Sequence, residues 1–191
     1  MGAASITHLT SSKGTTVFTQ REINEGFHDY YERLYSAPRE IADEVYDIFL
    51  DRAELIQLGD EFLEELGGPI TQAEIRGVIR GLANNKPPGL DGFPAELYKH
   101  FIDILAPRLQ KVYEEAWNRR QLPATLREPL IVPLPKAGQS KMSARDFRPL
   151  SMLTVYFKIL SKVLANRLSP HMQTLVHSDK NGFIPTCGNS L

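Results

Sequence analysis

Hydrophobic positions recur at helical spacing after residue 19. A Thr-x-x-Glu capping box, formed by Thr19 and Glu22, precedes an apolar and aromatic series at i, i+4, i+7, i+8 and i+11, which is one face of a helix: Ile23, Phe27, Tyr30, Tyr31 and Leu34. Pro38 ends this predicted helix, and a second amphipathic pattern runs from Ile41 to about Gly59. We expect the aromatic face to belong to a hydrophobic core, and the alternative is a helix that binds a partner protein.

The middle of the chain predicts more helices. Gly67-Gly68-Pro69 is typical of a linker, and a second capping box at Thr71 and Glu74 begins a helix that ends near Ala83. Residues 84–92, NNKPPGLDG, are dense in turn residues and predict a loop. Pro94 suits the first turn of the next helix, and Pro107 permits one more through Trp117. The residues expected to face inward here are Leu97, Phe101, Ile104 and Leu105.

The pattern changes after Gln121. Residues 130–134, LIVPL, form a short β-prone run, which the neighbouring prolines restrict to an edge or bulged strand. Residues 136–140 predict a turn, and residues 146–150 a returning extended segment. Ser151 or Thr154 can then cap a long helix with one apolar face, with Lys158, Lys162 and Arg167 on its flank and Pro170 at its end. The apolar face comprises Phe157, Leu160, Val163, Leu164 and Leu168.

Together these elements predict a helix-dominated α+β fold. We expect three segments: a flexible N-terminus over residues 1–18, an acidic helical segment over 19–66, and a third segment over 67–191. No internal repeat is visible.

Charge divides the chain. Over all 191 residues the formal net charge is −1. Residues 1–70 hold 5 Lys+Arg and 14 Asp+Glu, whereas residues 71–191 hold 17 and 9, so the two parts carry −9 and +8. Residues 119–191 alone hold 11 basic and 3 acidic residues. A basic part joined to an acidic part is a modest indication of nucleic-acid contact beside a separate extension.

Several classes of protein and site are excluded or disfavoured. The single Cys187 excludes an internal disulfide, and no apolar run is long enough to span a membrane. The chain contains neither a phosphate-binding P-loop motif nor a G-x-S-x-G nucleophile motif. His171, His177, Asp179 and Cys187 match no common metal-site spacing, so we expect no metal ligands. With no targeting signal visible, we expect an intracellular protein without a membrane partner, in the nucleus or the cytoplasm.

The predicted hairpin contains the most informative charges. Lys136 ends its first strand, and Arg148 lies in its second, within DFRPL. If the strands pair, both cations can reach one side of the tip. An ammonium beside a planar guanidinium is a natural clamp for a polyphosphate. The alternative is a pair of exposed surface cations.

Four sequence blocks carry a strong resemblance to a known family: ITQAEIRGVIRGLANNKPPGLDGFPAELYKHF, LIVPLPKAG, DFRPLSMLTVYFKILSKVLANRL and SDKNGFIP. In this order and spacing, across roughly residues 66–186, they resemble the start of a reverse transcriptase from a LINE-type non-LTR retrotransposon. Residues 19–65 also resemble the helical segment that joins the endonuclease to the polymerase in such proteins.

The resemblance implies roles for particular residues. Lys86 to Pro94, KPPGLDGFP, match the family's loop near the RNA template, which implies nucleic-acid contacts at Lys86, Gly89, Asp91 and Gly92. Lys136 and Arg148 match the fingers residues that hold the triphosphate of an incoming dNTP. The implied fold is the fingers part of a right-hand polymerase, and the implied partners are an RNA template, primer DNA and a dNTP.

The chain also departs from the family pattern. Family members reach their metal-binding aspartates after the GFIP block, and no F/Y-x-D-D motif occurs in these 191 residues. Thr186-Cys187 follow GFIP where Gly-Arg is usual. The complete enzyme implies Mg²⁺, whose two-metal chemistry needs those carboxylates, so we expect no cofactor, no catalytic residue and no polymerase activity in this chain alone.

Two alternatives to the polymerase fragment remain open. One is a non-catalytic nucleic-acid-binding module, with stacking surfaces at Tyr113, Trp117, Tyr156 and Phe157, although their helical spacing favours core positions. The other is a retroelement remnant, or a protein that binds a partner through residues 19–58.

Overall fold

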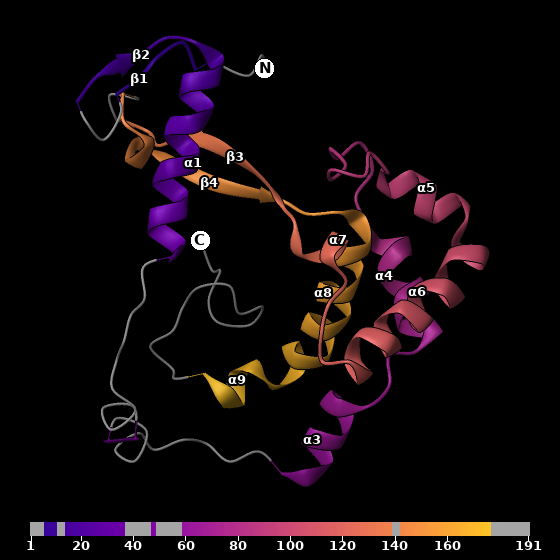
Figure 1. Ribbon diagram of the computed structural model, residues 1–191. Helices are drawn as coiled ribbons and strands as arrows, with labels where there is room; N and C mark the ends of the chain where they lie inside the picture. Colours follow the sequence, from indigo (N-terminus) through magenta and orange to yellow (C-terminus); the bar gives the residue numbers. More distant parts are fainter. Residues whose placement is uncertain (1–5, 11–13, 37–46, 49–58, 139–141, 177–191) are drawn as a thin grey trace. The chain divides into compact units, whose positions relative to one another are not determined.

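The computed structural model describes residues 6–10, 14–36, 47–48, 59–138 and 142–176. They form a helix-rich α+β fold with two separate two-stranded sheets, which confirms the predicted class. The chain divides into two compact units, coloured by sequence in Figure 1. Unit 1 comprises Met1–Arg52 and Ile131–Ser151, and unit 2 comprises Ala53–Leu130 and Met152–Leu191. These two packing units do not coincide with the segments 19–66 and 67–191 expected from the sequence. The boundary between those segments stays a prediction.

Helix α1 (Gln20–Ser36) is the main helix of unit 1. The predicted capping box is confirmed, because Thr19 Oγ1 accepts a hydrogen bond from the Glu22 N–H at 3.3 Å and the Glu22 carboxylate accepts one from the Thr19 N–H at 3.4 Å. The predicted core face is confirmed at Ile23, Phe27 and Tyr31, which are buried. Leu34 is an exception, since it is 53% exposed. The predicted second helix, residues 41–59, lies almost entirely outside the described residues.

A short antiparallel ladder packs against α1. Strands β1 (Leu9–Thr10) and β2 (Thr16–Val17) pair with Leu9 opposite Val17. Leu9 is buried beneath the helix, where its Cδ2 lies 2.8 Å from the place a Cβ on Gly26 would occupy. These strands lie in the segment predicted to be a flexible terminus. Two-residue strands are too short to show the alternation by which a strand is predicted.

The predicted hairpin is the second sheet of the structure. Strand β3 (Leu130–Pro135) pairs with β4 (Phe147–Met152), and a 3₁₀ turn, η1 (Ala144–Asp146), precedes β4. In a two-stranded sheet each strand is an edge, where proline is tolerated. One face of the hairpin is covered by α1, because the Phe147 ring meets the Phe27 ring edge-on at 5.1 Å.

Unit 2 is helical. Helix α4 packs against both α6 and α8 around one apolar core (Figure 1). The helices and turns are α3 (Asp60–Gly67), α4 (Gln72–Gly81), α5 (Ala95–His100), α6 (Ile102–Asn118), α7 (Ala124–Arg127), α8 (Val155–Leu168), η2 (Ser169–His171) and α9 (Met172–Leu175). Among the core residues are Ile75, Ile79, Tyr113, Ile159 and Val163, each no more than 2% exposed.

The predicted inward face around Phe101 is partly wrong. The structure breaks the helix at Phe101 and continues α6 through Pro107, whereas the sequence predicts a break near Pro107. The break shifts the helical phase, so Phe101 and Ile104 are 45% and 53% exposed, while Leu97 and Leu105 pack partly buried against the core. The residues that α6 buries are Ala106, Leu109, Tyr113 and Ala116.

Arg167 ties the end of α8 to the start of α4. Its guanidinium donates to both carboxylate oxygens of Glu74, at 2.6 and 2.9 Å, and to the carbonyls of Gly68 and Pro69, at 2.6 and 2.8 Å. Its side chain is 10% exposed. The sequence predicts Arg167 on the flank of this helix, and the structure shows that its guanidinium there supplies donors that the Gly68 and Pro69 carbonyls need.

Glu74 makes the stability of unit 2 depend on pH. Hydrogen bonds from Arg167 are the main cause that lowers the pKa of Glu74 from 4.5 to about 2, and the hydrogen bonds from Thr71 assist. A lowered carboxyl pKa stabilises the folded state above the unfolded pKa, and this contribution is lost as pH falls from 4.5 towards 2. Between about pH 6 and pH 3, urea unfolding should show wild type losing about 1–2 kcal/mol more than Glu74→Gln. If wild type and Glu74→Gln lost the same free energy of unfolding over this pH range, the Glu74 carboxylate would not be the source of the pH dependence.

Candidate functional site

The hairpin presents Lys136 and Arg148 on one face. The Lys136 N–H donates to the Asp146 carbonyl at 2.8 Å, which pairs these two residues where the strands meet at the tip. Counting along the strands from that pair places Arg148 opposite Leu134, two residues from Lys136 on the same face. Ile131 and Phe147, which this register puts on the opposite face, pack into the α1 core.

The two cations differ in their present contacts. The Lys136 ammonium donates one hydrogen bond, at 2.6 Å, to the Arg145 carbonyl, which leaves two of its three donors unused. Arg148 is exposed, and within the described part of the chain its guanidinium has no hydrogen-bond or ion-pair partner. Leu134 and Leu150, on the same face, are 43% and 46% exposed. This face therefore has donors available for an anion beside an open apolar surface.

The loop over residues 84–93 is anchored to helix α5. The Asn85 N–H donates to the Glu96 carboxylate at 2.6 Å, and this hydrogen bond is the main cause that lowers the pKa of Glu96. The Lys99 ammonium donates to the Asn84 side chain, also at 2.6 Å. Lys86, which follows these anchors, is exposed.

Gly89 and Gly92 have structural roles in this loop. The Gly92 N–H donates to the Gly89 carbonyl at 3.1 Å, which closes a turn, and Gly92 has φ +72°, a conformation that favours glycine. A Cβ on Gly89 would lie 2.6 Å from both N and Cα of Thr154. The loop backbone therefore packs directly on the residue that precedes α8.

Asp91 is half-buried in the same turn. Its Oδ1 accepts a hydrogen bond from the Phe93 N–H at 3.2 Å, which fixes the exit of the loop. Its Oδ2 is buried without a hydrogen-bond partner among the described residues. Oγ1 of Thr154 is buried without such a partner too, and Thr154, at the N-cap position of α8, makes no capping hydrogen bond. Burial is the main cause that raises the pKa of Tyr98, and the charge of Asp91 raises it further.

The predicted site residues fall into two groups. Lys136 and Arg148 are brought together in unit 1, whereas the loop residues Lys86, Gly89, Asp91 and Gly92 lie in unit 2. Within the loop group, Lys86 alone offers an exposed charge for a phosphate, since the other three shape the turn.

The described residues do not fit a two-metal site. Among them, the one group of three potential ligands is His28, Asp29 and Glu32, all exposed on α1. Mg²⁺ prefers oxygen ligands in octahedral geometry, and this set includes an imidazole on a single helix. Near the hairpin cations, Asp146 Oδ2 already accepts a hydrogen bond from the Ser143 N–H at 3.0 Å.

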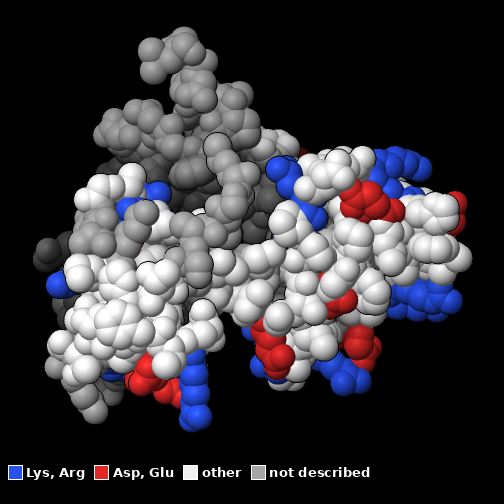
Figure 2. Space-filling model, turned by 90° about the horizontal axis from the view of Figure 1, so that it is seen from above, with Lys and Arg blue, Asp and Glu red and all other residues white. Residues whose placement is uncertain are grey.

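Charged side chains of both signs are interspersed on the face shown in Figure 2, and its described part has no continuous basic surface. In the described part of the chain, every helix is too short or too polar to cross a membrane.

Sequence reasoning missed two features of unit 2. The fit of the Arg167 guanidinium to the Gly68 and Pro69 carbonyls has no sequence signature. Trp117 was assigned to the core by its spacing, yet it is 59% exposed at a pocket, whereas Tyr113, one turn earlier, is 2% exposed. The signal that could have found Trp117 is the polar Asn118-Arg119-Arg120-Gln121 run that follows it.

Comparison with known proteins found two relatives from mobile elements. The chain is 29% identical to the Transposon TX1 uncharacterized 149 kDa protein of Xenopus laevis over 180 residues, which cover 94% of this chain and 14% of the relative. It is also 29% identical to the Retrovirus-related Pol polyprotein from type-2 retrotransposable element R2DM of Drosophila melanogaster. This match runs over 135 residues, which cover 71% of this chain and 12% of the relative. The chain thus spans a small part of the length of either relative. No family model matches the chain.

Proposed function

We propose that this chain, a homologue of non-LTR retrotransposon proteins, supplies the triphosphate-binding part of an RNA-directed DNA polymerase. The observation that carries the proposal is the shared hairpin face of Lys136, which is half-buried, and Arg148, which is exposed. The resemblance of the surrounding blocks, LIVPLPKAG and DFRPL, to the fingers of reverse transcriptases is consistent with the same assignment.

The proposed chemistry is electrostatic. The Arg148 guanidinium donates two parallel hydrogen bonds to one phosphate, and the Lys136 ammonium neutralises a neighbouring phosphate. Because α1 packs on the other face of the hairpin, the backbone positions of both residues are held by the core, which reduces the entropy lost when the triphosphate binds.

We further propose that Lys86 contacts the template backbone. It is the exposed cation of a loop that Glu96 and Lys99 anchor, and a single phosphate contact of this kind contributes affinity without sequence preference. Polymerisation is not proposed for this chain alone, since its 191 residues contain no F/Y-x-D-D motif.

Binding of a dNTP to purified protein tests the clamp. Removal of both cations in Lys136→Ala/Arg148→Ala is expected to weaken dTTP binding by about 10- to 100-fold, because charge-assisted hydrogen bonds are lost. Arg148→Lys keeps the charge but loses the bidentate geometry, so its affinity for dTTP should lie between those of wild type and the double variant. Isothermal titration calorimetry at low salt measures all three affinities.

The matched control is Arg108→Ala/Lys162→Ala, which removes the same two residue types from exposed helical positions of unit 2. Circular dichroism verifies that each variant is folded. Equal weakening by the control and the clamp variant would show diffuse attraction and would contradict the proposal.

A further inference from the structure

Unit 2 contains an open groove beside Trp117 that the proposed function does not use. Two adjoining pockets, of about 360 and 550 Å³, share Ile70, Tyr113, Trp117 and Leu164 in their linings. We name the pair the Trp117 groove. Volumes of this order are typical of small-ligand sites.

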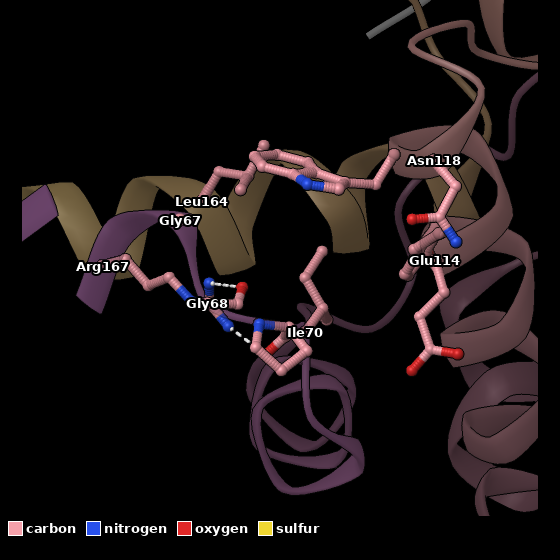
Figure 3. A pocket seen from close by; sticks show the side chains of 10 residues that line it. Gly67, Gly68, Ile70, Glu114, Asn118, Leu164 and Arg167 are labelled. Carbon is pink, nitrogen blue, oxygen red and sulfur yellow. Dashed lines mark hydrogen bonds between the residues drawn. The ribbon is translucent and has the colours of Figure 1, made fainter. Parts of the chain in front are cut away.

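The groove combines apolar walls with a polar rim. Trp117 and Leu164 are 59% and 38% exposed, so an indole and an aliphatic side chain are open to a ligand. In Figure 3, Glu114 and Asn118 come from α6 on one side of the smaller pocket, and Leu164 and Arg167 come from α8 on the other.

The rim groups have unused hydrogen-bonding capacity. Within the described residues, Glu114, Asn118, Arg120 and Gln121 have no side-chain hydrogen bond or ion pair. Arg167 differs, because its guanidinium is already used by Glu74 and the Gly68 and Pro69 carbonyls. A purely apolar occupant would remove water from the rim groups without replacing its hydrogen bonds, which is costly. The fitting occupant is a flat ring with polar edges.

Arg120 adds a cation at a position that favours glycine. It follows α6 with φ +49°, and the Arg120 and Gln121 N–H groups donate to the carbonyls of Trp117 and Ala116 at 3.0 and 3.1 Å. This is a Schellman helix end, in which glycine usually occupies the left-handed position. Arg120 and Trp117 both line the larger pocket of the groove, so this pocket combines a cationic residue with the exposed indole.

From these contacts we infer that the Trp117 groove binds a base of single-stranded nucleic acid. The base stacks on the Trp117 indole, its polar edge meets Glu114 or Asn118, and Arg120 contacts the adjoining phosphate. The inference does not depend on Lys136 and Arg148, which lie in unit 1.

Intrinsic fluorescence reports this event directly, since Trp117 is the sole tryptophan among the 191 residues. A single-stranded oligonucleotide should quench the emission saturably. Anisotropy of a labelled oligonucleotide then measures affinity in the variants. Trp117→Leu should weaken binding by about 5- to 100-fold, the usual effect of removing one stacking residue, and Trp117→Phe should retain part of the affinity.

Two further arms separate stacking from charge. An oligonucleotide of equal length with abasic sites should bind more weakly than its intact counterpart and should not respond to Trp117→Leu. Arg120→Gly should weaken binding while leaving urea stability unchanged or higher, because glycine adopts the φ of this position without strain. A mononucleotide tests whether one base is sufficient.

Equal affinity of wild type and a folded Trp117→Leu variant would overturn the inference. So would equal binding of the abasic strand. Self-association in sedimentation equilibrium that Trp117→Leu abolishes, with no oligonucleotide binding, would assign the groove to a second copy of the chain instead.

Discussion

Arg167→Ala should lower the free energy of unfolding by about 2–3 kcal/mol at neutral pH, at or just below the range found when one partner of a fully buried ion pair is removed, because the Glu74 side chain is 30% exposed. The guanidinium serves Glu74 and the carbonyls of Gly68 and Pro69 at once, and its side chain is 10% exposed. Alanine would remove this donor from the Gly68 and Pro69 carbonyls and would leave the Glu74 carboxylate with only its hydrogen bonds from Thr71. Urea unfolding followed by circular dichroism measures the change.

Three comparisons sharpen this result. Lys162→Ala, on the exposed side of the same helix, should change the free energy of unfolding by less than about 0.5 kcal/mol. Arg167→Lys keeps a charge but cannot donate to the same set of acceptors. Its free energy of unfolding should therefore lie between those of wild type and Arg167→Ala. In combination with Glu74→Gln, the effect of Arg167→Ala should become smaller, because the two side chains interact directly. A small effect of Arg167→Ala alone would show that water replaces the guanidinium without cost.

Gly89→Ala should destabilise the chain by about 2 kcal/mol through overpacking. The new Cβ would lie 2.6 Å from N and Cα of Thr154, and backbone atoms cannot rotate aside as a side chain can. The loop would have to move away from the start of α8. Urea unfolding measures the loss of stability.

Two other glycines supply matched controls. Gly92→Ala meets no atom within 4 Å but must adopt φ +72°, so only backbone strain of about 1 kcal/mol is expected. Gly77→Ala lies within α4 with open space around it and should stabilise the helix by up to about 1 kcal/mol. If Gly89→Ala were no more harmful than Gly92→Ala, the close approach to Thr154 would not be a constraint.

Local sequence signals predicted much of the fold. Both capping boxes, at Thr19 and Thr71, form as expected because their partners are three residues away. The β-prone run near residue 130 forms a strand, and its prolines correctly indicate an edge.

Features that depend on distant partners were not predictable. Leu9 is buried by a helix whose Gly26 allows close approach, and no local pattern records that fit. The break at Phe101 shifts the face of α6, so counting from Pro94 assigned Ile104 to the core although it is 53% exposed. For the hairpin, the sequence predicts only that Lys136 and Arg148 lie near its tip. That they share a face follows from the strand register, which the hydrogen bond from the Lys136 N–H sets.

Phosphorus NMR of dTTP tests most directly whether Lys136 and Arg148 together hold a triphosphate, because it observes the ligand's own phosphates as protein is added. Wild type should shift or broaden the β- and γ-phosphate signals, and Lys136→Ala/Arg148→Ala should not. The clamp would be contradicted if both proteins changed these signals equally, or if wild type left them unchanged at protein concentrations where the fold is intact.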